Sequence, residues 1–418
     1  MTTKNVNTRN FIAFWIFGLC NNFGFVMMLS AAQDILAKNE ESNGMNDNGN
    51  DQCVNTTSIH NCTPMSTGVV LLCNIFPGLL IKAIVPFFIY RIPYSVRHSI
   101  ICISTVISFL LTAFSENITV ALIGIMITSF ANGLGDNTYL SLSSHYSHYS
   151  ISGWSCGTGA SGLISSFVYA SLTDPLIFGL SSSTTMLISV IIPIIFAITY
   201  HFLLIKPSSI QTVQLSQPST WISLDTNGRN DNEEEGEGGI NITIQQTYVI
   251  WKGLLIYIIP IGLVYYAEYF INQGMIELTV FDCDNGYGTT PKSQYKWYQV
   301  LYQVGVFISR SSSDLIQLSL PILLILPVIQ LSNVCIFLFN AIYSFIPNFF
   351  IACILVIFEG LIGGSSYVHS FKYIHRNTDP SIREFALGAC TVSDGIGILL
   401  ASLTSIPAHN YICRITTH

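Results

Sequence analysis

The chain has 418 residues, of which 50% are hydrophobic and only 9% are charged, and its formal net charge is −7. A soluble domain needs a wet, charged surface, so this composition excludes an ordinary soluble protein. The acidity is concentrated in one segment that contains the glutamates at 233–235 and 237. The sequence has no cluster of basic residues suited to nucleic acid, so nucleic acid is not expected as a partner.

Apolar stretches of about 20 residues follow one another along the chain. A helix rises 1.5 Å per residue, so such a stretch matches the roughly 30 Å hydrocarbon layer of a bilayer. The sequence therefore predicts an all-α polytopic membrane protein, with the lipid bilayer as its surroundings and about eleven transmembrane helices. The predicted spans are residues 11–36, 66–90, 98–115, 118–141, 154–173, 184–205, 249–275, 296–314, 316–345, 349–371 and 385–407.

The first and the ninth predicted spans are longer than a bilayer requires. The first is too long for a signal peptide and has no small-residue cleavage site, so we interpret it as a retained span. The ninth is long for one span, and Pro321 and Pro327 either kink it or mark a short cytosolic segment at its start.

The polar segment 206–248 is rich in Ser, Asn, Gly, Gln and Glu, so we predict a disordered cytosolic linker. It separates an N-terminal six-helix bundle, residues 1–205 with a luminal loop at 37–65, from a C-terminal five-helix bundle, residues 249–418. Two pseudo-repeat bundles joined by a long middle loop are the plan of major facilitator transporters. Residues 130–139 and 358–367, in the fourth and tenth spans, share Phe, Gly and Tyr at matching positions, as a repeat would require.

Two independent signals predict the orientation. Lys and Arg flank the first span and the linker and crowd the loop before the last span, which predicts a cytosolic N-terminus. Glycosylation sequons at Asn55, Asn61 and Asn117 fall on the other, luminal side. With an odd number of spans the C-terminus would also be luminal.

Most of the eleven cysteines lie inside apolar stretches, where packing is the expected role. Cys53 and Cys62 differ, because both fall in the luminal loop. Either a Cys53–Cys62 disulfide or a free pair fits this position.

The function of such a chain depends on the polar groups that it retains inside the membrane, where a charged side chain costs about 2.5–3.5 kcal/mol. Glu268 and Asn272 share one helical face, and so do Gln303 and Arg310. For a single Asn, Gln or Ser, a hydrogen bond between helices worth about 0.6 kcal/mol is the simpler interpretation. For Glu268, Arg310 and Glu359 we favour a cavity or an ion pair. The candidate substrate-binding residues, on five predicted spans, are Asn21, Asn22, Glu268, Asn272, Gln273, Gln303, Arg310, Glu359, His369 and Asp394.

No catalytic spacing occurs, so we do not expect an enzyme, and the sequence indicates no cofactor. His145 and His148 have a spacing that suits two metal ligands, but no third ligand is evident, so exposed loop histidines are the simpler interpretation. The glycines at 157, 159 and 162 fit close helix contacts or a bend, since no Lys-Ser/Thr follows them as in a phosphate loop.

Several blocks, in order along the chain, resemble the battenin family of lysosomal membrane proteins. They include residues 17–23 (Phe-Gly-Leu-Cys-Asn-Asn-Phe), 267–274 (Ala-Glu-Tyr-Phe-Ile-Asn-Gln-Gly), 295–303, 305–312 (Gly-Val-Phe-Ile-Ser-Arg-Ser-Ser) and 359–364. The resemblance implies a major facilitator-like fold, a lysosomal or late endosomal membrane, and efflux or clearance of glycerophosphodiesters. The animal family member ends in a prenylation box, but here five residues follow Cys413, which does not fit that box.

A glycerophosphodiester is a small polar anion, so its site needs a cation and several amide or hydroxyl groups. Arg310 is the predicted phosphate partner, and His369 or Lys372 could assist near the cytosolic exit. Asn21, Asn22, Asn272 and Gln273 suit the hydroxyls. Glu268 and Glu359 could exchange protons between an acidic lumen and the cytosol.

Two other functions remain open. A carrier of basic amino acids or other small solutes would use Glu268 and Glu359 as counter-charges and make Arg310 a structural partner. A non-transporting organiser of lysosomal trafficking and pH homeostasis would bind cytosolic partners through the 206–248 linker.

Overall fold

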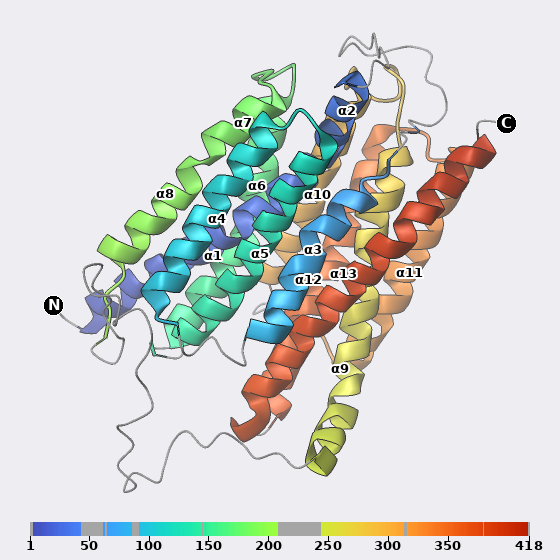
Figure 1. Cartoon of the computed structure of the whole chain (residues 1–418). Helices are drawn as coiled ribbons and strands as arrows, with labels where there is room; N and C mark the ends of the chain where they lie inside the picture. The colour runs from blue at the N-terminus through green and yellow to red at the C-terminus, as the bar shows by residue number, and fades with distance from the viewer. Residues whose placement is uncertain are drawn as a thin grey trace, which may run out of the picture.

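The computed structural model describes residues 3–42, 62, 65–85, 92–143, 145–146, 148–207, 244–312, 316–378 and 380–416. Its regular structure is helical, and the long helices run side by side along one common direction (Figure 1). The helices are α1 (Thr3–Ser30), α2 (Ala32–Ser42), α3 (Gly68–Ile84), α4 (Tyr94–Phe114), α5 (Ile118–Ser143), α6 (His148–Thr173), α7 (Ser182–Ser189), α8 (Ile191–Ile198), η3 (Thr199–Leu203), α9 (Ile244–Phe270), η5 (Ile271–Met275), η6 (Ile276–Leu278), α10 (Pro291–Ser311), α11 (Leu320–Tyr343), α12 (Phe349–Asn377) and α13 (Pro380–Thr416). The predicted Asn55 and Asn61 sequons, Cys53 and most of the 206–248 linker lie outside the described residues.

The prediction of a polytopic helical membrane protein is confirmed. In the described ranges, eight helices are long and apolar enough to cross a membrane, and α3 is a shorter apolar helix. Helices α6 and α10 do not meet that criterion because they carry many Ser, Gly, Gln and Tyr residues. Each predicted span overlaps one of the helices, but the number eleven and the bundle boundaries remain predictions. The long ninth stretch is not helical from its first residue, since α11 begins at Leu320 with Pro321 in its first turn.

Glycines allow pairs of helices to touch backbone to backbone. A methyl group at Gly157 of α6 would collide with the carbonyl oxygen of Trp15 in α1. In the same way, a methyl group at Gly360 of α12 would collide with the Tyr302 carbonyl oxygen in α10. Lipid provides no hydrophobic driving force between helices, so the close van der Waals packing that small residues allow stabilises these interfaces instead. The predicted close contact at the 157–162 glycines is therefore confirmed at Gly157.

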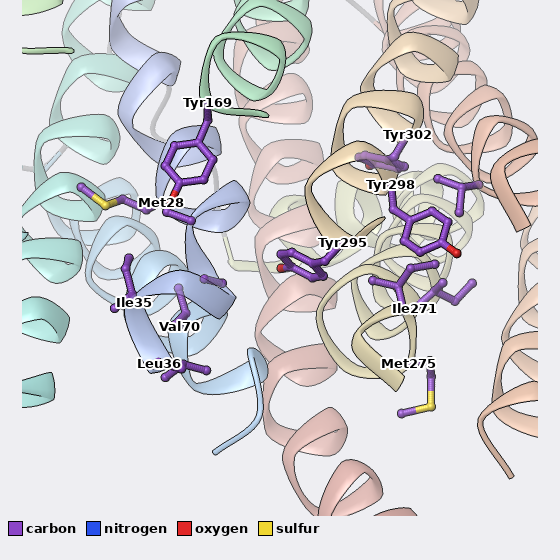
Figure 2. Close-up of a cluster of buried hydrophobic side chains, with 14 of the residues drawn as sticks. Met28, Ile35, Leu36, Val70, Tyr169, Ile271, Met275, Tyr295, Tyr298 and Tyr302 are labelled. Atoms are coloured by element: carbon purple, nitrogen blue, oxygen red, sulfur yellow. The ribbon is translucent and has the colours of Figure 1, made fainter. Parts of the chain in front are cut away.

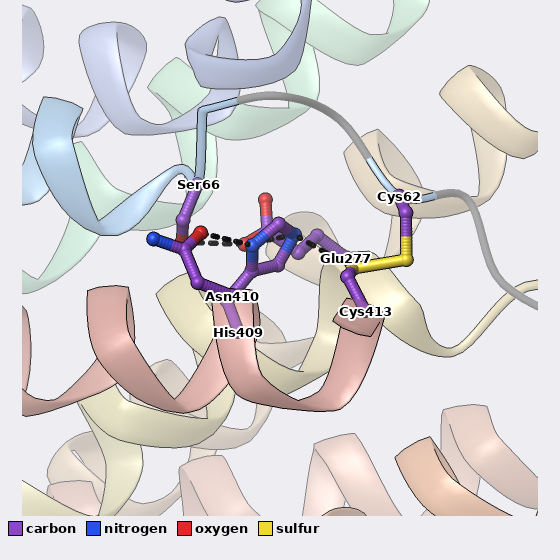
Figure 3. Close-up of a disulfide and its surroundings, with 6 residues drawn as sticks. All are labelled: Cys62, Ser66, Glu277, His409, Asn410 and Cys413. Atoms are coloured by element: carbon purple, nitrogen blue, oxygen red, sulfur yellow. Dashed lines mark hydrogen bonds and ion pairs between the residues drawn. A yellow bond between two sulfur atoms is a disulfide. The ribbon is translucent and has the colours of Figure 1, made fainter. Parts of the chain in front are cut away.

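A disulfide joins distant parts of the chain at one end of the bundle. Cys62 bonds to Cys413 near the end of α13, with a Cα–Cα distance of 5.7 Å (Figure 3). The predicted Cys53–Cys62 pairing is therefore wrong, because a cysteine forms one disulfide and the fold brings the C-terminal helix to Cys62. Cys283 is also disulfide-bonded. We call this end of the bundle, which also holds α2 and the C-terminus, the disulfide end; the N-terminus lies at the opposite end (Figure 1).

We refer to residues 3–207 as the N half and to residues 244–416 as the C half. One large hydrophobic cluster extends from one half into the other toward the disulfide end (Figure 2). Its N-half members include Met28, Ile35 and Tyr169, and its C-half members include Met275 and Tyr295. Because both halves contribute to one apolar core, they are held together at this end by packing as well as by the disulfide.

Candidate substrate-binding site between the two halves

One amide of the C half joins the backbone of Glu268 to the buried carboxylate of Glu359. The Asn272 Nδ2 donates to the Glu268 carbonyl oxygen at 3.0 Å and to Glu359 Oε1 at 2.9 Å. Asn272 lies in the π-helical turn η5, where the helix is locally unwound, a feature common at functional sites. The Glu268 and Glu359 side chains are 1% and 0% exposed, and Oε2 of each has no hydrogen-bond partner among the described residues. These carboxylates thus retain unused acceptors deep in the bundle.

A glycine makes room for one of these carboxylates. A methyl group at Gly363 of α12 would overlap Oε2 of Glu268. The close approach of α12 to α9 at this point therefore depends on the absence of a side chain at residue 363.

Arg310 contacts aromatic groups and not carboxylates. Its guanidinium donates to the Tyr265 hydroxyl at 3.1 Å and lies over the Tyr367 ring at 4.2 Å from the centroid. No described carboxylate is within the 4.0 Å ion-pair distance, and the buried Nε has no hydrogen-bond partner among the described groups. Arg310 is therefore a positive charge inside the bundle that no ion pair within the described part of the chain neutralises.

Arg310 and Gln303 face the N half across the helix pair α6 and α10. A Cβ at Gly159 would lie 3.9 Å from Arg310 Cδ, and a Cβ at Gly162 would collide with Gln303 Oε1. The predicted shared face of Gln303 and Arg310 is thus directed at two α6 glycines. Both side chains are half-buried, unlike Glu268 and Glu359.

The N half contributes its own polar cluster. Asn21 Nδ2 donates to Asp136 Oδ1 at 2.8 Å, and Lys82 Nζ lies 2.6 Å from Asp136 Oδ2. Asn132 Nδ2 donates to Asn22 Oδ1 at 3.2 Å, which joins α5 to α1. The buried Oδ1 of Asn21 has no hydrogen-bond partner in the described part of the chain. These residues come from α1, α3 and α5.

Asp394 of α13 connects the two clusters electrostatically. Its carboxylate interacts with the charges of Lys82, Asp136 and Arg310. Helices α3 and α13 run antiparallel against each other, with Gly68 against Ser405 and Leu79 against Gly395. Six helices from both halves, α3, α5, α9, α10, α12 and α13, therefore bring charges into the bundle.

The polar bonds that join the two halves gather at the disulfide end. Lys296 Nζ of α10 lies 2.8 Å from Asp34 Oδ2 of α2, and the Tyr169 hydroxyl donates to the same oxygen at 2.6 Å. Near the start of α3, the Ser66 hydroxyl and the Thr67 amide donate to Glu277 at 2.7 and 3.0 Å.

A second contact at this end involves the loop between α6 and α7. Asp174 accepts hydrogen bonds from Trp297 Nε1 at 2.8 Å and from the Ser293 hydroxyl. Burial opposes ionisation of Asp174, but these bonds outweigh it and hold the pKa of the carboxyl below its ordinary value. With both sets of bonds formed, the described conformation is closed at the disulfide end.

The structure places the predicted residues in different surroundings. Glu268, Asn272 and Glu359 form one cluster, whereas Gln273 lies at the disulfide end, where its backbone carbonyl oxygen accepts from the Thr67 hydroxyl of the N half at 2.9 Å. His369 lies apart from them.

The two ring nitrogens of His369 each lie 2.9 Å from a backbone carbonyl oxygen, Nδ1 from that of Ser365 and Nε2 from that of Ile316. A neutral imidazole has one N–H and can donate to only one of them. The ring lines a small pocket together with Gln317, Leu318, Lys372, Tyr373 and Arg376.

Sequence reasoning missed Lys82 and left Asp136 out of the site. Lys82 is a charged residue inside a predicted span, so the rule that selected Arg310 would also have selected it. The disulfide-end residues Asp34, Lys296 and Glu277 lie near predicted span ends, where charges are ordinary and give no signal. Within the described residues, no group of three or more His, Cys, Asp or Glu side chains could hold a metal ion.

Comparison with solved structures shows the fold. A bacterial homologue of the human lysosomal transporter Spinster, in an inward-facing and unoccupied conformation, superposes with a TM-score of 0.57 at 10% identity, covering 96% of this chain and 82% of that one. A D-xylose–proton symporter gives a TM-score of 0.57 at 12% identity, with coverage of 96% and 89%. These likenesses confirm the predicted major facilitator-like architecture.

Comparison with known sequences shows the family. A profile of the family described as CLN3 protein matches residues 12–415. Battenin of Canis lupus familiaris is 37% identical over 416 residues, which cover 99% of this chain and 93% of that protein. The protein btn-1 of Neurospora crassa is 34% identical over 452 residues, with 98% and 90% covered. This multi-pass membrane protein, with the fold of solute transporters, therefore belongs to the CLN3 protein family.

Proposed function

We propose that this protein is a lysosomal or vacuolar carrier that moves glycerophosphodiesters out of the lumen by alternating access. The observation that carries the proposal is the Arg310 guanidinium, which faces the interface of the two halves without an ion-pair partner among the described carboxylates. A buried charge needs compensation, and a phosphodiester that enters the interface would supply it.

The neighbours of Arg310 also favour an anionic substrate over a basic one. A carrier of basic solutes would keep Arg310 in an ion pair with Glu268 or Glu359, but the guanidinium contacts Tyr265 and Tyr367 and interacts with Glu268 only electrostatically, beyond the ion-pair distance. The polar side chains of the N half, Asn21 and Asn22 among them, suit the hydroxyls of a glycerol group.

The disulfide end suits the luminal side. Disulfides form and persist in oxidising compartments and not in the cytosol. The exposed Asn117 sequon, in the turn between α4 and α5, belongs to the same end of the bundle. With the disulfide end luminal, the N-terminus is cytosolic, and the described conformation is closed to the lumen.

Uptake into proteoliposomes tests the substrate. Arg310→Gln should abolish glycerophosphodiester flux, and Arg310→Lys should retain part of it, because lysine keeps the charge but not the bidentate fork. Arg9→Gln is the matched control, since Arg9 donates to backbone carbonyls of Phe202 and Leu203 outside the interface. Full flux in a well-folded Arg310→Gln protein would move the anion site elsewhere.

We also propose that transport is coupled to protons through Glu268 and Glu359. Support comes from their burial and from their unpartnered oxygens, since carboxylates in membranes commonly form proton relays. Glu268→Gln should remove the dependence of flux on luminal pH. An unchanged pH dependence in this variant would exclude Glu268 as the coupling group.

The alternative of a trafficking organiser depends on the 206–248 linker, of which residues 208–243 lie outside the described residues. Deleting residues 227–239 separates the two functions. A carrier should keep its flux, whereas an organiser should lose its effect on trafficking.

A further inference from the structure

One lysine of the N half lies between two aspartates that belong to different halves. Lys82 Nζ is 2.6 Å from Asp136 Oδ2 on α5 of its own half. The same ammonium also interacts electrostatically with Asp394 on α13 of the C half, but no ion pair within 4.0 Å joins Lys82 and Asp394. Lys82 is therefore paired with one of its two available carboxylates.

The register of α3 against α13 explains this arrangement. Gly68 of α3 packs against Ser405, and Leu79 packs against Gly395, eleven and ten residues further along two antiparallel helices. One helical turn beyond Leu79, Lys82 thus lies beside the α13 turn that contains Asp394. Lys82 is also in the last turn of α3, on the side away from the disulfide end.

The two halves are bonded at the disulfide end, and α3 and α13 are already packed from Gly68 to Leu79, so closure of the opposite end would tighten the last turn of α3, with Lys82, against α13. We propose that Lys82 exchanges partners during this movement: it pairs with Asp136 in the described conformation and with Asp394 when the disulfide end opens. This inference deepens the proposed alternating access and rests on it, but it does not depend on the identity of the substrate.

The surroundings of Lys82 favour such an exchange. The side chains of Lys82 and Asp136 are 26% and 18% accessible, so the pair is not locked in a dry seam. Asn21 Nδ2 donates to Asp136 Oδ1 at 2.8 Å and would remain bonded to this carboxylate after the lysine leaves. Because one cation serves two carboxylates, each conformation leaves one carboxylate without its ion pair, and neither state is favoured by a large margin.

The conformational populations of the purified full-length protein test the proposal without any substrate. Spin labels carried by a ketone-bearing amino acid at Leu176 and Phe345 avoid the native cysteines and report the separation of the halves at the disulfide end. Both residues are exposed, and they belong to different halves. Double electron–electron resonance then gives the ratio of the long-distance to the short-distance population.

Asp136→Asn should raise the long-distance population about fivefold, and Asp394→Asn should lower it by a similar factor. In a Lys82→Gln background both effects should disappear, because the exchanged cation is gone. Glu116→Gln, which removes an exposed carboxylate in the α4–α5 turn, should change nothing. Where an Asn variant does not fold, Ser at the same position serves instead.

Shifts of the same sign in the two aspartate variants, no shift in either, or shifts that persist with Lys82→Gln would overturn the exchange. The proposed substrate site would be refuted by a different result, full glycerophosphodiester flux in the Arg310→Gln protein. The two failures are therefore distinguishable.

Discussion

Breaking the Cys62–Cys413 disulfide should lower the stability of the fold and leave transport largely intact. The bond closes a loop with a sequence separation of 351 residues. For an unfolded random chain, the loop-closure relation assigns such a bond about 6 kcal/mol.

The effect in a membrane should be smaller. Apolar helices stay inserted when a membrane protein unfolds, so the chain ends are already confined, and we expect about 2–4 kcal/mol. Transport should persist because Cys62 is connected to Thr67 by five residues, which can extend to about 17 Å. This tether is long enough to allow the halves to separate at the disulfide end.

The assay compares thermal unfolding of the purified protein, with and without reductant, against the double variant Cys62→Ser/Cys413→Ser. Reductant also breaks the disulfide at Cys283 in both proteins, so the wild-type protein should lose more stability in reductant than the double variant, and the two should then unfold at similar temperatures. Cys73→Ser, which removes a free cysteine, is the matched control. Equal unfolding temperatures for the wild-type protein and the double variant without reductant would refute the stabilising role, and loss of flux in the variant would refute the flexible tether.

Three further predictions concern packing and charge. Lys296→Met should destabilise the disulfide end by about 3 kcal/mol, because it leaves the half-buried Asp34 carboxylate without its cation; faster hydrogen exchange in α2 checks this. Gly157→Leu should cost about 1–3 kcal/mol in thermal unfolding by forcing α6 away from α1, whereas Gly253→Ala, where a methyl group meets open space, should cost nothing. The hydrogen bonds that lower the pKa of Asp174 contribute stability above the carboxyl's unfolded pKa and lose it as the pH falls through the folded value. Asp174→Asn should therefore destabilise the protein at neutral and mildly acidic pH, and in a pH series of unfolding temperatures the difference should begin to shrink only below about pH 4.

Hydropathy and charge along the sequence were sufficient to predict the helical membrane architecture of this chain. Every predicted span overlaps a helix, because apolar length against bilayer thickness is a local property of the sequence. The rule that intramembrane charges are costly also selected Glu268, Arg310 and Glu359, which the structure places at the centre of the bundle. The family resemblance, carried by blocks such as residues 267–274, is confirmed over nearly the whole chain.

Pairing between distant segments could not be predicted in the same way. The sequence left a Cys53–Cys62 disulfide or a free pair as the alternatives for Cys62, and neither holds, because the antiparallel return of α13 brings Cys413 to it. The partner of Lys82 and the tyrosine surroundings of Arg310 likewise depend on helix registers that hydropathy does not contain. Apolar length decides which segments enter the membrane, whereas the contacts among them follow from side-chain shape and close glycine packing, which act only after the helices have met.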